Sequence, residues 1–264
     1  MLIKLTDQCQ MMCPHCMEDA KPKGRMMSIE TFKNAVRFAT HIGCMHQVLS
    51  GGEPTENGLI LSMCAWLDSV NPAGGFTIVS NGMWLKDEYK KAQIELITRI
   101  PSFICMQVYS NKKWYKEYDY VAEHKDEYEK YRGVIVDLDE KIYMQDLGRA
   151  RFDAEAQKEV MANHHFMSCI NAVLVAKQVE EPVGYGISML LRHKFCNPSV
   201  DCEGFVHISE SRLCPSVGNV NTDSFDDIWN NMRAFKPCGK CHQYQTFINS
   251  DTPKAVLAKQ IIGL

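Results

Sequence analysis

The chain has 264 residues, of which 45% are hydrophobic and 23% are charged, and its formal net charge is −3. This composition suits a globular protein built as one large domain, or as one domain with a small appendage. The lack of a basic excess argues against a nucleic-acid-binding class. No apolar run reaches the roughly 18 residues of a membrane span, and the N-terminus lacks the apolar segment of a secretory signal. We therefore expect a cytoplasmic protein with neither membrane nor nucleic acid as a partner.

The chain contains twelve cysteines, which is a large number for its length. Without an export signal, clustered thiols in a reducing compartment indicate metal ligands rather than disulfides. Three cysteines stand alone in apolar surroundings, and we expect them to be buried core residues: Cys44, Cys64 and Cys105. Most of the others form one group near the N-terminus and another in the tail.

Strand-like and helix-like patterns alternate through the first half of the chain. Strands are predicted at 2–6, 47–50, 76–79 and 103–108, and a fifth strand or a hairpin at 134–136 and 141–144. Helices are predicted at 28–42, with Ser28 as N-cap, and at 57–70, 85–99 and 112–131. The last helix is rich in charged residues and tyrosine, and we expect it to be a solvated surface helix.

Repeated strand–helix units predict an α/β fold with a parallel sheet, either open or closed as a barrel. In both cases ligands gather at the carboxyl ends of the strands. Four polar segments are expected at that edge: the loop carrying the first cysteines, Gly51–Pro54, Ser80–Gly82 and Ser110. The pattern weakens after residue 151, and we place a domain boundary near residue 190, with one domain at 1–190 and a second at 191–264.

Cys9, Cys13 and Cys16 place three thiolates within eight residues, on the loop after the first strand. Electron-transfer clusters normally take four cysteines, so three protein ligands leave one iron of a [4Fe–4S] cluster open to another ligand. On spacing alone, a zinc site completed by His15 or a pair of redox thiols remains an alternative.

The cysteine triplet, following Leu5-Thr6, resembles the signature of the radical S-adenosylmethionine (SAM) superfamily. Gly51-Gly52-Glu53-Pro54 is similar to the glycine-rich motif after the second strand in that superfamily. Ser80-Asn81-Gly82 resembles the Thr-Asn-Gly that often follows the third strand. The three motifs occur in the expected order. The resemblance implies a partial (β/α)6-type barrel, the radical SAM fold.

The resemblance also implies the cofactors. Cys9, Cys13 and Cys16 would bind three irons of a [4Fe–4S] cluster, and SAM would chelate the fourth through its amino and carboxylate groups. Reduction by a flavodoxin- or ferredoxin-type donor would then cleave SAM to a 5′-deoxyadenosyl radical, which abstracts a hydrogen atom from the substrate. No catalytic residue is assigned beyond these ligands. The residues implied to lie against SAM are Gly51, Gly52, Glu53, Pro54, Ser80, Asn81, Ser110 near the ribose, Arg149 near the carboxylate, and His15 near the adenine.

The tail resembles the SPASM or twitch extension of radical SAM enzymes, a small cysteine-rich hairpin-and-helix unit. The likeness rests on Cys202, on Leu213-Cys214-Pro215, on Gly218-Asn219-Val220, on Ile228-Trp229 and on Cys238-x2-Cys241. It implies one auxiliary [4Fe–4S] cluster bound by Cys202, Cys214, Cys238 and Cys241, with Cys196 as a possible substitute. A structural zinc ribbon is the alternative, because the same thiolates suit zinc.

Proteins with this extension often modify ribosomally made peptides or proteins by crosslinking, epimerisation or oxidation. We therefore expect a peptide- or protein-modifying radical SAM enzyme, on fold-level analogy. A small-molecule radical SAM enzyme or a glycyl-radical-enzyme activase is the first alternative, and a non-catalytic metal-binding module is the second. The first strand begins at residue 2, so no N-terminal leader-recognition domain is expected.

Overall fold

The computed structural model describes residues 1–138, 148–162, 168–192, 198–210, 214–237, 239 and 242–264. Within these residues the centre of the molecule is one eight-stranded sheet with the order β5-β4-β3-β2-β1-β6-β7-β8. Strands β1 to β6 all run parallel to one another, and β7 is antiparallel to both β6 and β8. The strands are β1 Leu2–Lys4, β2 Gln47–Ser50, β3 Phe76–Ser80, β4 Phe103–Tyr109, β5 Val134–Asp137, β6 Ser199–Val200, β7 Phe205–His207 and β8 Gly218–Asn219.

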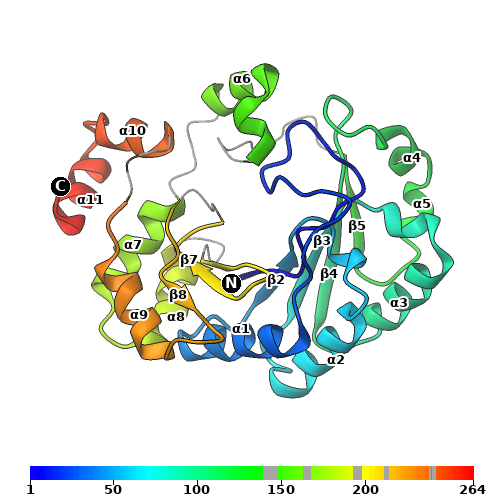
Figure 1. The fold of residues 1–264 in the computed structure, drawn as a ribbon, viewed down its shortest axis with the longest axis horizontal. Coiled ribbons are helices and arrows are strands. Elements are labelled where there is room, and N and C mark those ends of the chain that lie inside the picture. The colour runs from blue at the N-terminus through cyan, green and yellow to red at the C-terminus, as the bar shows by residue number, and fades with distance from the viewer. Residues whose placement is uncertain (139–147, 163–167, 193–197, 211–213, 238, 240–241) are drawn as a thin grey trace.

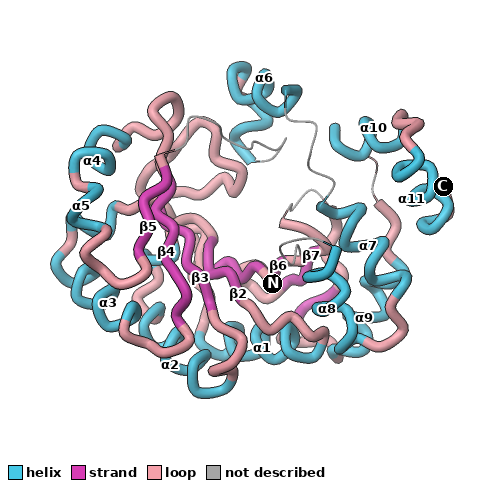
Figure 2. Tube along the Cα trace, turned by 180° about the vertical axis from the view of Figure 1, so that it is seen from behind, coloured by secondary structure: helices cyan, strands magenta, loops and turns pink. Residues whose placement is uncertain are grey.

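From β1 to β5 the chain always moves to the next strand in the same direction. Right-handed crossovers that proceed in one direction put every connecting helix on the same face of the sheet. The first three helices accordingly lie outside the curved sheet (Figures 1 and 2). The sheet is a barrel wall that does not close, so the predicted α/β partial barrel is confirmed.

The predicted strands and the first three predicted helices lie within a few residues of the observed ones. The predicted helix at 112–131 is wrong, because the structure has a loop and two short helices there. The possible strand at 141–144 lies outside the described residues. The helices are α1 Ile29–His41, α2 Ile60–Val70, α3 Glu88–Thr98, α4 Tyr118–Glu123, α5 Lys125–Tyr128, α6 Ala154–Ala162, α7 Ser168–Gln178, α8 Pro182–Arg192, α9 Phe225–Ala234, α10 His242–Ile248 and α11 Pro253–Ile262, with 3-10 turns η1 Pro54–Glu56, η2 Met83–Lys86 and η3 Gly148–Phe152.

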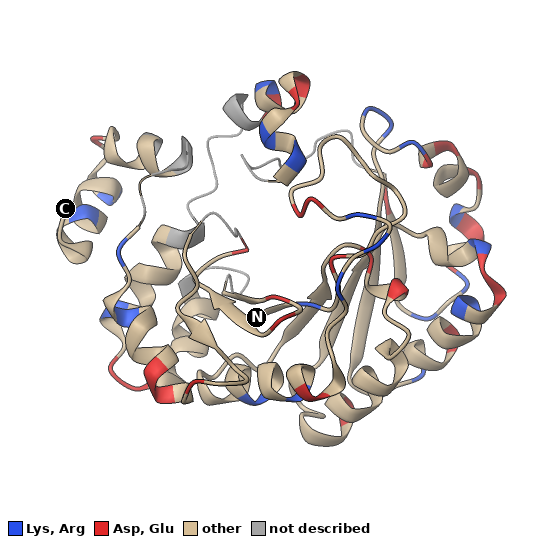
Figure 3. Cartoon of the chain, viewed as in Figure 1, with Lys and Arg blue, Asp and Glu red and all other residues tan. Residues whose placement is uncertain are grey.

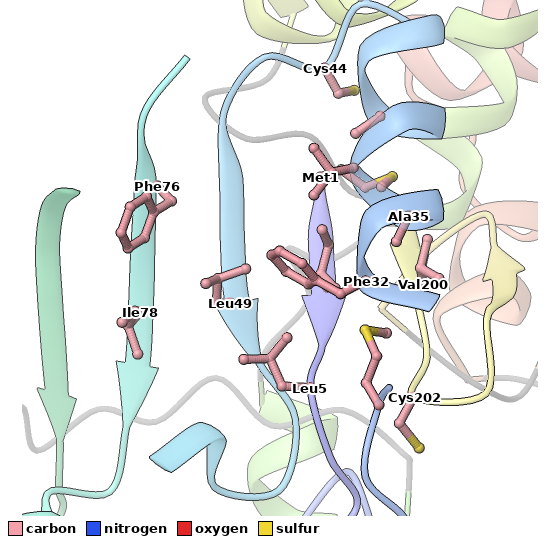
Figure 4. Close-up of a cluster of buried hydrophobic side chains, with 14 of the residues drawn as sticks. Met1, Leu5, Phe32, Ala35, Cys44, Leu49, Phe76, Ile78, Val200 and Cys202 are labelled. Carbon is pink, nitrogen blue, oxygen red and sulfur yellow. The ribbon is translucent and has the colours of Figure 1, made fainter. Parts of the chain in front are cut away.

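The outer face of the sheet forms the core with the helices. Ile3, Leu49 and Ile78 are fully buried, and Leu49 lies close to Phe32 of α1 (Figure 4). Cys44 and Cys64 are buried as predicted. Acidic and basic residues are interspersed over the outer helices, without a face of one sign (Figure 3).

The inner face of the sheet has a different character. Because side chains alternate along a strand, the residues between the core positions point inward. Val48, Thr77 and Gln107 lie at such positions, and all three are half-buried. Cys105 pairs with Thr77 and is also half-buried, so the prediction that it belongs to the core is wrong. Its neighbour Met106 is fully buried on the helix side, whereas Cys105 itself faces inward.

The tail continues the same sheet. Ser199 and Val200 of β6 pair with Leu2 and Ile3 of β1, so strands from both sides of the predicted boundary near residue 190 lie in one sheet. Asn221 further connects the tail to α1, because its Nδ2 donates to Thr31 Oγ1 at 3.2 Å. Among the described helices, none is long and apolar enough to cross a membrane.

Helix α1 begins at the cap that the sequence predicts. The Ser28 hydroxyl accepts a hydrogen bond from the amide of Thr31 at 3.1 Å. We expect Ser28→Ala to lower the free energy of unfolding by about 1 kcal/mol, the usual value of an N-cap side chain. Urea denaturation measures this change. Ser69→Ala is the control, because Ser69 is an exposed residue near the end of α2 and should change stability by less than about 0.5 kcal/mol. Equal effects of the two variants would contradict the assigned role of Ser28.

Candidate active site

The three N-terminal cysteines lie on one irregular loop between β1 and α1, at the carboxyl edge of the sheet. Cys9 and Cys13 are buried and Cys16 is half-buried. Burial raises the pKa of Cys9 to about 12 and that of Cys13 to about 11, and the neighbouring thiols add to both shifts. Cys9 and Cys13 are therefore protonated at neutral pH without a metal. Metal binding to them releases protons.

The loop after β2 holds the cysteine loop through its backbone. The amide of Gly52 donates to the Thr6 carbonyl at 2.7 Å, and the amide of Glu53 donates to the Gln8 carbonyl at 2.8 Å. A Cβ on Gly52 would lie 2.2 Å from that Gln8 oxygen, and one on Gly51 would lie 2.4 Å from the Thr6 oxygen. The two glycines are therefore needed for contact between two backbones. Their predicted contact with SAM stays a prediction.

Glu53 is fully buried and connects two motif loops. Its carboxylate accepts hydrogen bonds from the Thr55 hydroxyl at 2.7 Å, the Ser80 hydroxyl at 2.9 Å and the Asn81 amide at 2.7 Å. Burial raises the pKa of Glu53, and these hydrogen bonds oppose the rise. Pro54 follows at the first position of η1. Glu53 thus fixes the loop after β3 to the loop after β2.

Asn81 carries this connection to the cysteines. Its Nδ2 lies 3.6 Å from the Cys9 sulfur, and its Oδ1 accepts from the Met83 amide at 2.9 Å. Gly82, in the left-handed region at a φ of 84°, allows the turn that brings Asn81 there. Three motifs far apart in sequence therefore meet at one edge of the sheet, as the topology predicts.

Arg149 lies in η3 and contacts the cysteine loop at several points. Its Nε donates to the Cys13 carbonyl at 2.9 Å, and its Nη1 donates to the Ala20 carbonyl at 2.7 Å and to the Asp19 carboxylate at 3.0 Å. Its backbone amide donates to the Cys16 carbonyl at 2.8 Å. The side chain predicted to bind the SAM carboxylate thus holds the loop that carries the thiols. The predicted contact with SAM remains a prediction.

Gly148 allows Arg149 to come this close. Its φ is +50°, and a Cβ there would lie 2.4 Å from the Cys16 carbonyl oxygen. A larger residue would push η3 away from the cysteine loop. The Gly-Arg pair therefore acts as a unit in which the glycine permits the approach and the arginine makes the bonds.

His15 lies among aromatic rings, with ring centroids 5.4 Å from Trp114 and 4.9 Å from Tyr115. It is buried, and burial lowers its pKa to about 4, with the Arg149 charge adding to the shift, so the imidazole is neutral at neutral pH. Ser110 is also buried, directly after β4, and its hydroxyl has no hydrogen-bond partner among the described residues. The predicted contacts of His15 with the adenine and of Ser110 with the ribose stay predictions.

In the tail, the structure describes two of the five predicted cysteines. Cys202 lies in the turn after β6 and Cys214 lies before β8, and both are buried. Cys196, Cys238 and Cys241 lie outside the described residues. Among the described side chains, no three His, Cys, Asp or Glu residues are grouped so that they could hold one metal ion.

Comparison with curated proteins gives a partial match. No family model matches the chain. A GTP 3′,8-cyclase of Synechococcus sp. (strain CC9605) is 29% identical over 98 residues, which cover 34% of this chain and 28% of the cyclase. A GTP 3′,8-cyclase of Clostridium perfringens (strain SM101 / Type A) is 26% identical over 102 residues, which cover 37% and 32%. The match thus spans less than a third of the length of these relatives, which are radical SAM enzymes.

Comparison with solved structures covers most of the chain. BtrN in complex with AdoMet and 2-DOIA matches 93% of this chain and 83% of its own, with a TM-score of 0.55 and 13% identity. SuiB of Streptococcus suis bound to the precursor peptide SuiA matches 96% and 73%, with a TM-score of 0.53 and 11% identity. The chain therefore shares the fold of BtrN and SuiB, and about a third of its sequence is similar to GTP 3′,8-cyclases. At these identities the structures show the radical SAM fold, and the substrates named belong to BtrN and SuiB.

Three contributions to this candidate site were not predicted. Trp114 and Tyr115 were assigned to a solvated helix, yet they pack against His15. Asn57, which is buried, donates from Nδ2 to the Leu5 carbonyl at 2.9 Å and so fixes the end of β1. Lys4 is buried inside the sheet. Only Lys4 had a signal in the sequence, because a lysine interrupts an otherwise apolar strand.

We expect Glu53→Gln to lower the free energy of unfolding by about 1–3 kcal/mol, because the glutamine NH2 would replace either the oxygen that accepts from Ser80 or the one that accepts from Asn81, and would leave that donor unsatisfied. Chemical denaturation of the metal-free protein measures the change. Glu88→Gln is the control, because Glu88 is exposed on α3 and should contribute less than about 0.5 kcal/mol. A loss in Glu53→Gln no larger than in the control would show that the carboxylate does not hold the two loops.

We expect Arg149→Met to speed amide hydrogen exchange in residues 13–20 by about tenfold or more, because a hydrogen bond to a charged group contributes about 1.5–3 kcal/mol. Mass spectrometry of the metal-free protein measures the exchange. Arg151→Met is the matched control, since Arg151 is exposed in the same turn. Unchanged exchange in Arg149→Met would contradict its role in holding the loop.

Proposed function

We propose that this chain is a radical SAM enzyme whose Cys9, Cys13 and Cys16 bind a [4Fe–4S] cluster. When bound, a reduced cluster of this kind together with SAM supplies a 5′-deoxyadenosyl radical that abstracts a hydrogen atom from the substrate. The three thiols supply ligands for three irons, and each thiolate binds its own iron, so the thiols need not converge on one ion. A flavodoxin- or ferredoxin-type protein is the proposed electron donor.

The observation that carries this proposal is the meeting of the three motifs at one edge of the sheet. Asn81 reaches the Cys9 sulfur, and Gly52 and Glu53 bind the cysteine loop through their amides. The same fold, in BtrN, is described in complex with AdoMet. Ligands of parallel α/β sheets bind at this carboxyl edge, and the fit between the loops therefore supports a SAM site there.

The residues of this chain have separate roles in the proposed site. The amides of Gly52 and Glu53 already donate to the cysteine loop. The SAM ammonium is itself a donor, so we assign it to backbone carbonyl groups of the loop after β2. Neutral His15 contributes a buried ring to the adenine side, and the Ser110 hydroxyl a polar group to the ribose side. Buried Glu53 and half-buried Arg149 hold the loops and help to exclude water.

For the tail we propose an auxiliary [4Fe–4S] cluster bound by Cys202, Cys214, Cys238 and Cys241, with Cys196 as a substitute. The burial of Cys202 and Cys214 supports metal ligation but suits a zinc ribbon equally well. We keep the division at residue 190, with a radical SAM barrel before it and the auxiliary-cluster unit after it.

As substrate we propose a ribosomally made peptide or protein. The likeness to SuiB, described with its precursor peptide bound, supports this choice. A small molecule is the second candidate, because BtrN is described with 2-DOIA and the curated relatives are named for GTP. Incubation of the enzyme with each class of candidate, followed by mass spectrometry, separates the two.

The proposed function predicts about eight irons and no zinc per chain in protein purified without oxygen, from two four-iron clusters. It also predicts that the reduced, iron-loaded protein forms 5′-deoxyadenosine when it is incubated with SAM. Cys13→Ala should abolish this product, and Cys64→Ala, in the core, should leave it unchanged. About four irons with one zinc per chain would contradict the auxiliary cluster but not the cluster bound by Cys9, Cys13 and Cys16. No 5′-deoxyadenosine from the iron-loaded protein would favour a non-catalytic metal-binding module instead.

A further inference from the structure

Lys4 is a buried charge that the proposed chemistry does not use. It is the last residue of β1, and its side chain is 1% exposed. Its neighbour Ile3 pairs with Leu49 on the core side, so Lys4 lies on the inner face of the sheet, where it pairs with Ser50. A lysine in this position needs partners, since an unpaired buried ammonium is strongly unfavourable.

The partners of Lys4 come from two distant segments. Its ammonium lies 2.7 and 2.9 Å from the two carboxylate oxygens of Glu18, and it donates to the Glu210 carbonyl at 2.7 Å. These contacts account for the three donors of an ammonium. Glu18 follows Cys16 by two residues, and Glu210 precedes Cys214 by four. One side chain therefore joins both cysteine-bearing segments to the central strand.

The charge balance at this point depends on Lys4. Burial raises the pKa of the Glu210 carboxyl, which the Lys4 charge lowers and the Glu18 charge raises. Lys4 therefore offsets the repulsion between the Glu18 and Glu210 carboxyl groups, which come from different segments. Inside the curve of the sheet, basic and acidic segments lie close to the N-terminus (Figure 3).

A second connection between the same segments is weaker. Arg25 binds Asp7, with Nη2 2.8 Å from Oδ2, and also binds Glu203 next to Cys202. The Arg25 side chain is 58% exposed and that of Glu203 42% exposed, so water screens this bridge. Lys4 is thus the buried member of two ionic connections between the cysteine loop and the tail.

We propose that Lys4 is a positioning residue that fixes the cysteine loop and the Cys202–Cys214 segment relative to each other. It does so by binding a carboxylate on one segment and a backbone carbonyl on the other. A displacement of either segment would leave a buried charge unsatisfied, so the two move together. The inference rests on the proposed function only in taking the cysteines of the two segments to be metal ligands.

Two variants test this proposal. Lys4→Met removes the buried cation that binds Glu18 and should lower the thermal unfolding midpoint. The double variant Lys4→Met, Glu18→Gln removes both charges and should recover most of that midpoint. We expect the double variant to keep faster amide exchange, by about tenfold (roughly 1.4 kcal/mol), in both 16–21 and 201–207. Lys33→Met, which removes a lysine paired with Glu30 on α1, is the control and should change neither segment.

Wild-type exchange in either segment of the double variant would overturn the proposal, because Lys4 would then not hold both. The second readout is the electron paramagnetic resonance spectrum of the reduced, iron-loaded protein with SAM. We expect the g-values of the double variant to differ from those of the wild type, and those of Lys33→Met to be unchanged. An unaltered spectrum in the double variant would contradict a role in positioning the cluster ligands. Wild-type protein that takes up no iron would contradict the proposed function, while the exchange result would still decide the role of Lys4.

Discussion

The structure depends on holding an irregular loop of more than twenty residues in one conformation. The loop between β1 and α1 has no helix or strand of its own to satisfy its backbone groups, yet it must bring three thiols together. Buried backbone groups need partners. Some of these partners lie within the loop, where the Cys9 amide donates to the Lys21 carbonyl at 2.8 Å. Others come from outside it: Gly52 and Glu53 from the turn after β2, and Arg149 from η3. The position of the cysteines is therefore a property of the whole barrel edge.

This constraint explains why charged and polar residues are buried around the loop. Glu53, Lys4 and Asn57 are fully or nearly fully buried, and each bonds a segment that is distant in sequence. Such groups contribute little net stability when paired, but removing one partner is costly because the other is left buried and unsatisfied. They therefore act mainly by making alternative loop positions unfavourable. Specificity of conformation is what a cluster ligand set requires.

Local sequence patterns predicted the elements whose formation depends on residues near in sequence. The alternating patterns depend on near neighbours, and the strands they predict at 47–50 and 76–79 are observed. The same holds for the helix cap at Ser28. The partial barrel followed from the repetition of these units. The prediction failed at Cys105 and at 112–131, where the outcome depends on which face of the sheet a residue takes and on packing against His15. For Arg149 the motif predicts a contact with SAM, which stays a prediction. The motif does not specify the Cys13 and Ala20 carbonyls and the Asp19 carboxylate that Arg149 contacts in the structure.

The two faces of the sheet also separate what is constrained from what is free to vary. On the outer face, Leu49, Ile78 and Met106 are fully buried against helices, so changes there disturb packing. On the inner face, Val48, Thr77 and Gln107 are only half-buried, and Gln107 donates to Asp137 across to β5 at 2.9 Å. A substitution at these positions alters the lining of the barrel without opening the core. Proteins that share this fold can therefore keep the edge that holds the cysteine loop and differ in the inner face, and the choice of substrate would depend on that face rather than on the motifs.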